Sequence, residues 1–281
     1  NSKCSLPQML STERPDKAAN HLLSGRVVVI VNGSPYVLIM PCVFVDFLSS
    51  AEDPNLKFQY ANLLKFVRLV AFFITLLLPG LYVAITNFHQ EIIPTELLFA
   101  IVASRESVPF PIIVEILAME ISFELIREAS LRVPSPIGTT IGIIGALILG
   151  QAAVEASIVS PILIIIVAIT GITSFAIPDF YLSFHLRIVR FLYIIAGFLA
   201  GFLGIGIVLF SHLVLLCSLK SFGVSYLAPF VPATSKNNKA YFMPPFWNRE
   251  KRPDFLNTKR PQKEARISMK WKYKIGGNNG N

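Results

Sequence analysis

The chain has 281 residues, of which 53% are hydrophobic and only 15% are charged, and its formal net charge is +8. An ordinary soluble domain carries about 25% charged residues. This composition argues against a soluble globular protein and directs attention to the lipid bilayer. We therefore expect a mainly α-helical, polytopic membrane protein with about four transmembrane helices.

Residues 1–66 are the part of the chain that looks least like a membrane segment. Two β-rich runs, residues 27–31 and 36–40, flank an Asn32-Gly33 pair. An Asn-Gly pair between such runs is a strong signal for a β-hairpin. A hairpin this small is not stable alone, so it either belongs to a larger soluble domain or packs at the membrane surface. We expect residues 1–66 to be the C-terminal remnant of such a soluble domain.

Four apolar stretches are long enough to cross a membrane, which takes roughly 20 apolar residues and at least about 17. Only residues 155–157 separate the second stretch from the third, so these two are expected to form a tight helical hairpin. All four lie in an expected membrane domain over residues 67–232. The expected spans are residues 67–87, 137–154, 158–177 and 191–217.

An acidic region lies between the first and second expected spans. Residues 89–136 hold seven glutamates and three arginines. Pro109 and Pro111 can open a helix within this region, and we expect an amphipathic helix over residues 110–132. At roughly 100° per residue, four charged side chains fall on one face of that helix. They are Glu120, Glu124, Arg127 and Glu128.

Two interpretations of this charged face stay open. In the first, it is the solvated face of a helix at the membrane interface, with ion pairs three or four residues apart. In the second, several copies of the helix line an aqueous path and the glutamates face water, because rings of acidic side chains favour cations.

Small residues recur four positions apart in two of the expected spans. Such stripes let helix backbones approach closely in lipid, so we expect both to be helix-packing faces. The first stripe ends beside Glu155, which either reaches the interface from its helix end or lies near the interior of a bundle. The packing residues are Gly138, Gly142, Ala146 and Gly150 in the second span, and Gly197 and Gly201 in the last.

The last segment, residues 233–281, carries twelve basic and three acidic residues. Basic flanks stay on the cytoplasmic side of a membrane. We therefore expect a disordered cytoplasmic tail that is attracted to anionic lipid rather than to nucleic acid. An even number of spans then places residues 1–66 on the same side.

Motifs of soluble enzymes do not occur in the chain. It has no phosphate-binding loop, no Gly-x-Ser-x-Gly and no His-Glu-x-x-His. The three cysteines and four histidines show no metal-ligand spacing. We expect neither catalysis, nor a metal, nor a cofactor.

Several long runs are far more distinctive than any short motif. Together they resemble the A subunit of GerA-type spore germinant receptors of endospore-forming bacteria, over most of the chain up to about residue 232. The runs are PQMLSTERPD (7–16), GRVVVIVNGSPYVLIMP (25–41), NFHQEIIPTELL (87–98), ASRESVPFPIIVEILAMEISFELIREASLRVPSPIG (103–138), GALILGQAAVEASIVSP (145–161) and CSLKSFGVSYLAPFVP (217–232).

The resemblance implies a multi-pass protein of the spore inner membrane that helps to start germination when nutrients appear. In that family the A subunit acts with a transporter-like B subunit that senses nutrients and with a lipoprotein C subunit. It is thought to self-associate into a nutrient-gated ion conduit. Family members also carry a large soluble domain before the part seen here, so we expect the chain to be a fragment that lacks it.

On this basis we hypothesise that Glu120, Glu124 and Glu128 line a cation path, with Arg127 pairing internally and Glu155 near the bundle interior. The main alternative is a non-conducting membrane scaffold that docks the nutrient-sensing subunit. A secondary transporter is less favoured, because such proteins often show internal repeats and none is visible here.

Overall fold

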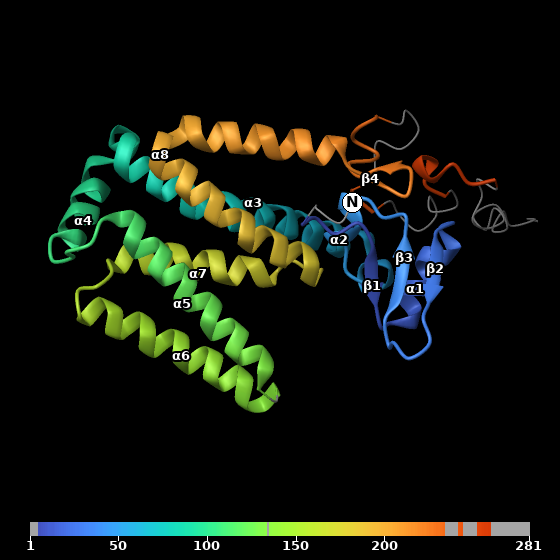
Figure 1. Ribbon diagram of the computed structural model, residues 1–281, viewed down its shortest axis with the longest axis horizontal. Helices are drawn as coiled ribbons and strands as arrows, with labels where there is room; N and C mark the ends of the chain where they lie inside the picture. The colour runs from blue at the N-terminus through green and yellow to red at the C-terminus, as the bar shows by residue number, and fades with distance from the viewer. Residues whose placement is uncertain (1–4, 134, 234–240, 244–251, 260–281) are drawn as a thin grey trace, which may run out of the picture. The chain divides into compact units, whose positions relative to one another are not determined.

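Helices dominate the protein, and two small antiparallel sheets complete it (Figure 1). The expected mainly helical class with a small hairpin is therefore confirmed. The computed structural model describes residues 5–133, 135–233, 241–243 and 252–259.

Two compact units divide the chain. Unit 1 combines residues 1–66 with residues 215–281, and unit 2 comprises residues 67–214. The expected membrane domain also begins at residue 67. Residues 215–232, which the sequence analysis placed in that domain, are grouped with unit 1 instead.

The expected hairpin of unit 1 is present as β2 (Val27–Ile30) and β3 (Val37–Met40), which pair antiparallel. Gly33 in the turn has a φ of +85°, a backbone conformation that glycine adopts without strain. A third strand, β1 (Leu10–Thr12), pairs with the other edge of β3 and was not anticipated. Three residues are too few for a period-two pattern to stand out.

A short hairpin that follows the last helix joins the core of unit 1. The Ser221 hydroxyl donates a hydrogen bond to the Gln8 carbonyl (2.7 Å) and accepts one from the Cys42 amide (3.1 Å). These two bonds link residues far apart in the sequence. The remaining elements of this unit are α1 (Pro15–Leu23), α2 (Phe44–Phe47), η1 (Asp53–Asn55), β4 (Lys220–Ser221), β5 (Val224–Ser225) and η4 (Asp254–Leu256).

A buried ion pair stabilises unit 1. The Arg26 guanidinium donates two hydrogen bonds to the Asp46 carboxylate, at 2.5 Å and 2.8 Å, and the side chains are 4% and 14% exposed. Burial alone would raise the pKa of Asp46, but the charge and hydrogen bonds of Arg26, with smaller contributions from His21 and the Val43 amide, together outweigh burial and lower this pKa. Burial, reinforced by the Asp46 charge, raises the pKa of the Cys42 thiol to about 12, which keeps the thiol neutral.

Parts of the expected basic tail also belong to unit 1. The Lys65 ammonium, near the start of a long helix, donates to the Tyr241 carbonyl (3.0 Å). The Arg252 Nε donates to the Leu23 carbonyl (3.0 Å). These two stretches of the tail are therefore packed against the rest of the unit, and the other residues of the tail lie outside the described part of the chain.

Long helices make up unit 2. The helix expected over residues 110–132 is present as α5, which starts directly after Pro111. The helices are α3 (Phe58–Phe88), which begins in unit 1, η2 (Gln90–Ile92), α4 (Thr95–Arg105), α5 (Ile112–Arg132), α6 (Ser135–Glu155), α7 (Pro161–Phe175) and α8 (Phe180–Ser218).

The apolar stripe of α5 forms the centre of the core of unit 2. Ile116 and Met119 are buried there with Leu163 and Val167 of α7. α6 also packs mainly against α5. The expected short connection between α6 and α7 is present, and the two helices touch near it, at Gly150 and Ile164. Beyond that point each helix packs mainly against α5 (Figure 1).

The helix α8 doubles back on itself. Ala200 and Gly201 leave the helical conformation, and Gly201 has φ +59° and ψ −138°, a region open essentially to glycine alone. The rings of His185 and His212 lie 5.5 Å apart as a result. The expected span over residues 191–217 stays a prediction, and the chain reverses its direction within it at Ala200 and Gly201. We call residues 180–200 the first half of α8 and residues 201–218 the second half.

Contacts between the helices define their directions. α5 and α6 are antiparallel: Gly142 of α6 lies at Ser130 of α5, and Gly145, one turn later on α6, lies at Ile126, one turn earlier on α5. α3 and the first half of α8 are parallel, because Gly80 lies at Tyr193 while Phe88 lies near the tip of the α8 hairpin. α5 is antiparallel to the first half of α8, as ion pairs described below show. α7 is parallel to α5, because Ser160 before its start lies at Glu115 and Phe175 at its end lies at Arg127. Successive long helices, with α8 counted as two, therefore alternate in direction.

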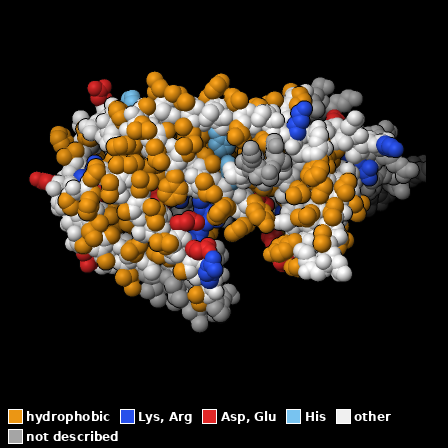
Figure 2. Space-filling model, viewed as in Figure 1, with side chains coloured by type: hydrophobic (Ala, Val, Ile, Leu, Met, Phe, Trp, Pro, Cys, Tyr) orange, Lys and Arg blue, Asp and Glu red, His pale blue; other side chains and the backbone are white. Residues whose placement is uncertain are grey.

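Two of the described helices, α3 and α8, are long and apolar enough to cross a membrane, judged by length and composition. α7 is apolar but has only 15 residues. Apolar side chains are spread over the surface of unit 2 (Figure 2). They include Ile172, Leu203 and Phe210, whose exposed fractions are 70%, 67% and 71%. Four spans stay a prediction.

Candidate functional site

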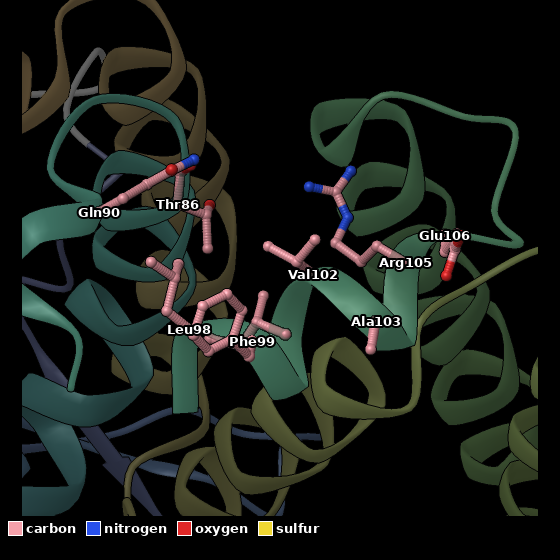
Figure 3. Close-up of a pocket in the computed structure, with 9 residues that line it drawn as sticks. Thr86, Gln90, Leu98, Phe99, Val102, Ala103, Arg105 and Glu106 are labelled. Atoms are coloured by element: carbon pink, nitrogen blue, oxygen red, sulfur yellow. The ribbon is translucent and has the colours of Figure 1, made fainter. Parts of the chain in front are cut away.

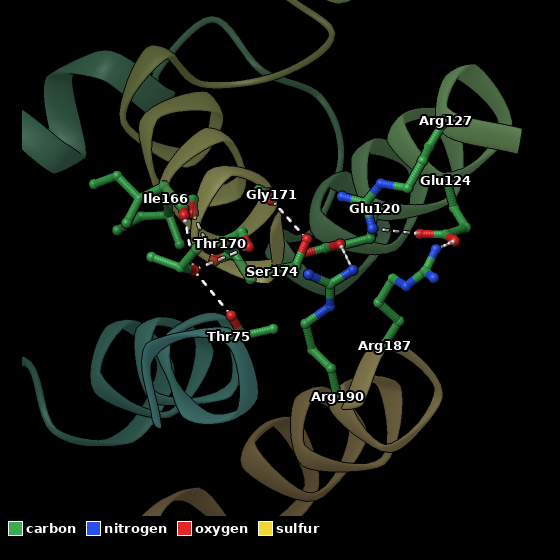
Figure 4. Close-up of polar contacts among 12 residues, drawn as sticks. Thr75, Glu120, Glu124, Arg127, Ile166, Thr170, Gly171, Ser174, Arg187 and Arg190 are labelled. Carbon is green, nitrogen blue, oxygen red and sulfur yellow. Dashed lines mark hydrogen bonds and ion pairs between the residues drawn. The ribbon is translucent and has the colours of Figure 1, made fainter. Parts of the chain in front are cut away.

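A cluster of charged side chains lies between α5 and the first half of α8 (Figure 4). The Glu120 carboxylate pairs with Arg190 at 2.5 Å, and both side chains are almost fully buried, at 1% and 2% exposure. The Glu124 carboxylate pairs with Arg187 at 2.5 Å and with Arg127 at 3.4 Å. We call these five residues the charge cluster.

The two helices bring these groups together through their own periodicity. Glu120 and Glu124 are four residues apart on α5, and Arg187 and Arg190 are three apart on α8. Residues at these spacings share one face of a helix. Because the helices are antiparallel, the earlier glutamate meets the later arginine.

The cluster carries more positive than negative groups. Its two carboxylates face three guanidiniums. From the sequence, this face of α5 was expected to be acidic and to face water. In the structure Glu120 is buried, Glu124 is 31% exposed, and both carboxylates are paired. The reason is that α8 supplies counter-ions from a segment more than 60 residues further along the chain.

Arg127 also connects α5 with α7. Its guanidinium lies over the Phe175 ring, 4.7 Å from the centroid, in a cation–π arrangement. A side chain at Gly171 would approach the same guanidinium, with 3.9 Å between its Cβ and Nη2. Arg127 therefore pairs within its own helix, as expected, and also contacts the end of a neighbouring helix.

A hydroxyl contact between α3 and α7 lies near the charge cluster (Figure 4). The Thr75 hydroxyl donates to the Thr173 hydroxyl at 3.0 Å. Thr173 in turn donates to the Ile169 carbonyl at 2.9 Å, within its own helix. This contact gives the hydroxyls of Thr75 and Thr173 hydrogen-bond partners inside an apolar unit.

A second buried carboxylate was missed from the sequence. Glu115, whose side chain is 0% exposed, pairs with Arg105 of α4 at 3.0 Å. It also accepts a hydrogen bond from the Ser160 amide at the start of α7 (3.2 Å). Glu115 thus connects α4, α5 and α7, and the only signal for it was a single carboxylate inside an apolar run.

Two of the proposed path residues lie away from the charge cluster. Glu128 pairs with Arg132 at 2.7 Å on the surface, where the side chains are 57% and 78% exposed. Glu155 is exposed and accepts a hydrogen bond from the Gln151 amide group at 2.9 Å. The structure therefore gathers Glu120, Glu124 and Arg127, and leaves Glu128 and Glu155 outside.

Some of the proposed packing residues lie at close contacts between helices. A Cβ on Gly197 would lie 2.6 Å from the Gly80 carbonyl oxygen, so α3 and α8 touch through their backbones. The partner, Gly80, was not anticipated. A Cβ on Gly142 would lie 2.9 Å from the Ser130 hydroxyl, whereas one on Gly150 would make an ordinary contact at 3.8 Å.

The other proposed packing residues differ in kind. Gly201 is the turning point of α8, where a Cβ would lie 3.0 Å from His89 Cε1. It therefore acts through its backbone conformation as well as through its size. The surroundings of Gly138 and Ala146 are outside what the structure describes of α6.

A pocket of about 630 Å³ opens between the end of α3 and α4 (Figure 3). Thr86 and Gln90 lie on one side of it, and the Arg105 guanidinium lies on the other. Leu98, Phe99 and Val102 form an apolar wall. Among the described residues, no three His, Cys, Asp or Glu side chains come together as metal ligands.

The chain combines a small unit of helices and antiparallel strands with an apolar helical unit that encloses paired charges. These features define its class, a helical, membrane-associated protein. The chain belongs to the Bacillus/Clostridium GerA spore germination protein family, whose family model matches residues 1–255. No solved structure matches the chain significantly.

Curated relatives agree with this family. Spore germination protein KA of Bacillus subtilis (strain 168) is 49% identical over 252 residues, which cover 89% of this chain and 46% of the relative. Spore germination protein GerLA of Bacillus cereus is 41% identical over 261 residues, covering 92% and 53%. Uncharacterized membrane protein YfkQ of Bacillus subtilis (strain 168) is 41% identical over 264 residues, covering 92% and 51%. The chain spans about half the length of these relatives.

Proposed function

We propose that the chain is a membrane subunit of a nutrient-responsive spore germinant receptor and that its helical unit forms a cation path in an oligomer. Relatives named as spore germination proteins support the first part. The observation that carries the second part is the charge cluster inside an apolar helical unit.

Ionisable groups within a membrane bundle are costly and mark ion pathways or proton relays more often than plain packing. Glu120 and Glu124 are the groups whose charge would stabilise a dehydrated cation between the helices. Their counter-ions, Arg187 and Arg190, lie on a helix that doubles back at Gly201. A path along this face of α5 therefore has both binding groups and a neighbouring element to regulate them.

The alternation of helix directions supports a multi-pass topology in the spore inner membrane. We propose that α3, α5, α6, α7 and both halves of α8 each traverse the bilayer. Six traverses keep residues 1–66 and the basic tail on one side, the cytoplasmic side by the positive-inside rule. This differs from the four expected spans, because α5 is now a traverse and the last expected span is a hairpin.

The proposed partners follow from the family. They are a transporter-like B subunit that senses the nutrient, a lipoprotein C subunit and further copies of this chain. Anionic lipid is the proposed partner of the basic residues beyond residue 233. The helix-packing residues, among them Gly142, Gly150 and Gly197, are proposed to support the bundle rather than to bind ions.

The experiment measures potassium release after nutrient addition from spores that carry the complete receptor. Glu120→Gln and Glu124→Gln keep the size of the side chain and remove its charge. We expect slower or abolished release in both, at receptor levels matched by immunoblot. Glu96→Gln, an exposed position on α4, is the matched control and should release potassium like the wild type.

A non-conducting scaffold that docks the sensor subunit is the second candidate. One observation favours it: Glu115, Glu120 and Glu124 are all paired within the chain. Such pairing is what we expect of groups whose only role is to hold helices together. Wild-type release from both glutamine variants would reject the cation path and leave the scaffold.

A further inference from the structure

The charge cluster has a composition that opposes cation binding in the state described here. Each carboxylate already holds a guanidinium, and the five groups sum to one positive charge. A mobile cation that entered this layer would meet a net positive charge and no free carboxylate. The described arrangement is therefore that of a closed path.

We propose that the pairs Glu120–Arg190 and Glu124–Arg187 form an electrostatic latch that holds the path closed, and that the path opens when the first half of α8 withdraws its two arginines from α5. Permeant cations then replace the guanidiniums at the carboxylates. This inference rests on the proposed cation path and assigns its regulation to α8.

The contacts of the first half of α8 are suited to such a movement. On one side it meets α3 backbone to backbone, at Gly80 and Gly197. The Tyr193 Cβ, 3.3 Å from where a Cβ on Gly80 would lie, is the nearest side-chain atom there, so a movement of the first half of α8 against α3 would displace few side chains at that point. At its end, Gly201 takes a non-helical conformation, so the direction of the helix is not fixed by continuous hydrogen bonding there.

The two pairs also make the closed state sharply defined. Separating the Glu120–Arg190 pair, whose side chains are 1% and 2% exposed, leaves two buried charges uncompensated, which is strongly unfavourable. Glu124 is 31% exposed, so its pair with Arg187 contributes less. An intermediate in which the helices are slightly apart therefore has little stability. The carboxylates therefore favour two distinct arrangements, one paired with arginine and one paired with a mobile cation. A gate requires two such states.

The test is potassium release without nutrient from spores that carry the complete receptor with Arg187→Gln or Arg190→Gln. We expect basal release to rise about tenfold or more, because loss of such a pair shifts a two-state equilibrium by at least that factor. The charge exchange Glu124→Arg with Arg187→Glu restores the pair in reverse and should lower basal release again. Arg132→Gln, which breaks only the surface pair with Glu128, is the matched control and should stay at the wild-type level.

The outcomes separate this inference from the proposed function. If Glu124→Gln impairs nutrient-evoked release but neither arginine variant leaks, the path stands and the latch is overturned. If Glu120→Gln and Glu124→Gln both leave release unchanged, the path itself fails. If receptor levels fall in the arginine variants and in the charge exchange alike, the pairs hold the fold rather than a closed state, and the latch is also overturned.

Discussion

The two units of this protein bury arginine in different ways. In unit 1, Arg26 meets Asp46 through two hydrogen bonds, one guanidinium for one carboxylate, over 20 residues of sequence. In unit 2, three guanidiniums share two carboxylates, and the main pairs join helices 63 or more residues apart. A balanced, local, bidentate pair favours a single arrangement. In the proposed latch, the unbalanced set of pairs between two helices is the part that exchanges partners.

The largest expected effect is the loss of the pair in unit 1. Asp46→Ala leaves Arg26 buried without a counter-ion and also removes the acceptor of the Val43 amide (2.8 Å). We expect a loss of about 3–5 kcal/mol in the free energy of unfolding, measured by thermal denaturation of the purified protein in detergent. Asp16→Ala, which affects only an exposed pair with Arg14, should unfold like the wild type. Equal stability of the two variants would contradict a structural role for Asp46.

A smaller effect is expected where α3 and α8 touch. Gly197→Ala would place a Cβ 2.6 Å from the Gly80 carbonyl oxygen, and overpacking of this kind costs about 1–3 kcal/mol. Gly206→Ala is the control on the same helix, because nothing lies within 4 Å of its Cβ position. Alanine there should be neutral or stabilising, by up to about 1 kcal/mol. If both variants lower the unfolding temperature equally, the close contact is absent in solution.

The stability of unit 1 should depend on pH in a direction that follows from Asp46. Its pKa is lowered below the ordinary value of 3.8, so the folded state binds its proton less readily than the unfolded state does. The stabilisation is present above about pH 4 and is lost as the pH falls through the folded pKa. The difference in unfolding temperature between the wild type and Asp46→Asn should therefore shrink between pH 6 and pH 3. A constant difference would show that Asp46 acts through its hydrogen bonds rather than its charge.

The smallest effect is expected at the exposed end of α5. Glu128→Gln removes a surface pair with Arg132, and such pairs four residues apart on a helix contribute about 0.3–0.5 kcal/mol. Although Glu128 lies on the same face by sequence, we expect its variant to release potassium much more like the wild type than Glu124→Gln does. Equal loss of release in both would extend the path to the surface and weaken the contrast between buried and exposed carboxylates.

The sequence was a reliable guide where local signals suffice. The Asn32-Gly33 pair predicted the hairpin of β2 and β3, and the prolines ahead of residue 112 predicted the start of α5. The amphipathic character expected for α5 agrees with the burial of Ile116 and Met119 on its apolar side. Turn chemistry, helix starts and periodicity are properties of a few neighbouring residues.

The sequence was a poor guide where a partner lies far along the chain. Arg187 and Arg190 appeared only as an interruption of an apolar run, and nothing near Glu120 or Glu124 announced their counter-ions. The reversal at Gly201 was hidden too, since glycine is common in membrane helices and its φ of +59° cannot be read from composition.

By itself, the amino-acid sequence determined an apolar, mainly helical chain with a β-hairpin, an acidic helix and a basic end, because these depend on composition and on local periodicity. Only the tertiary structure decided which charges are buried, which are paired and where α8 turns back. Antiparallel packing of α5 and α8 converts an apparently acidic face into a neutralised, slightly positive layer, and the electrostatics of a buried group depend on its neighbours in space.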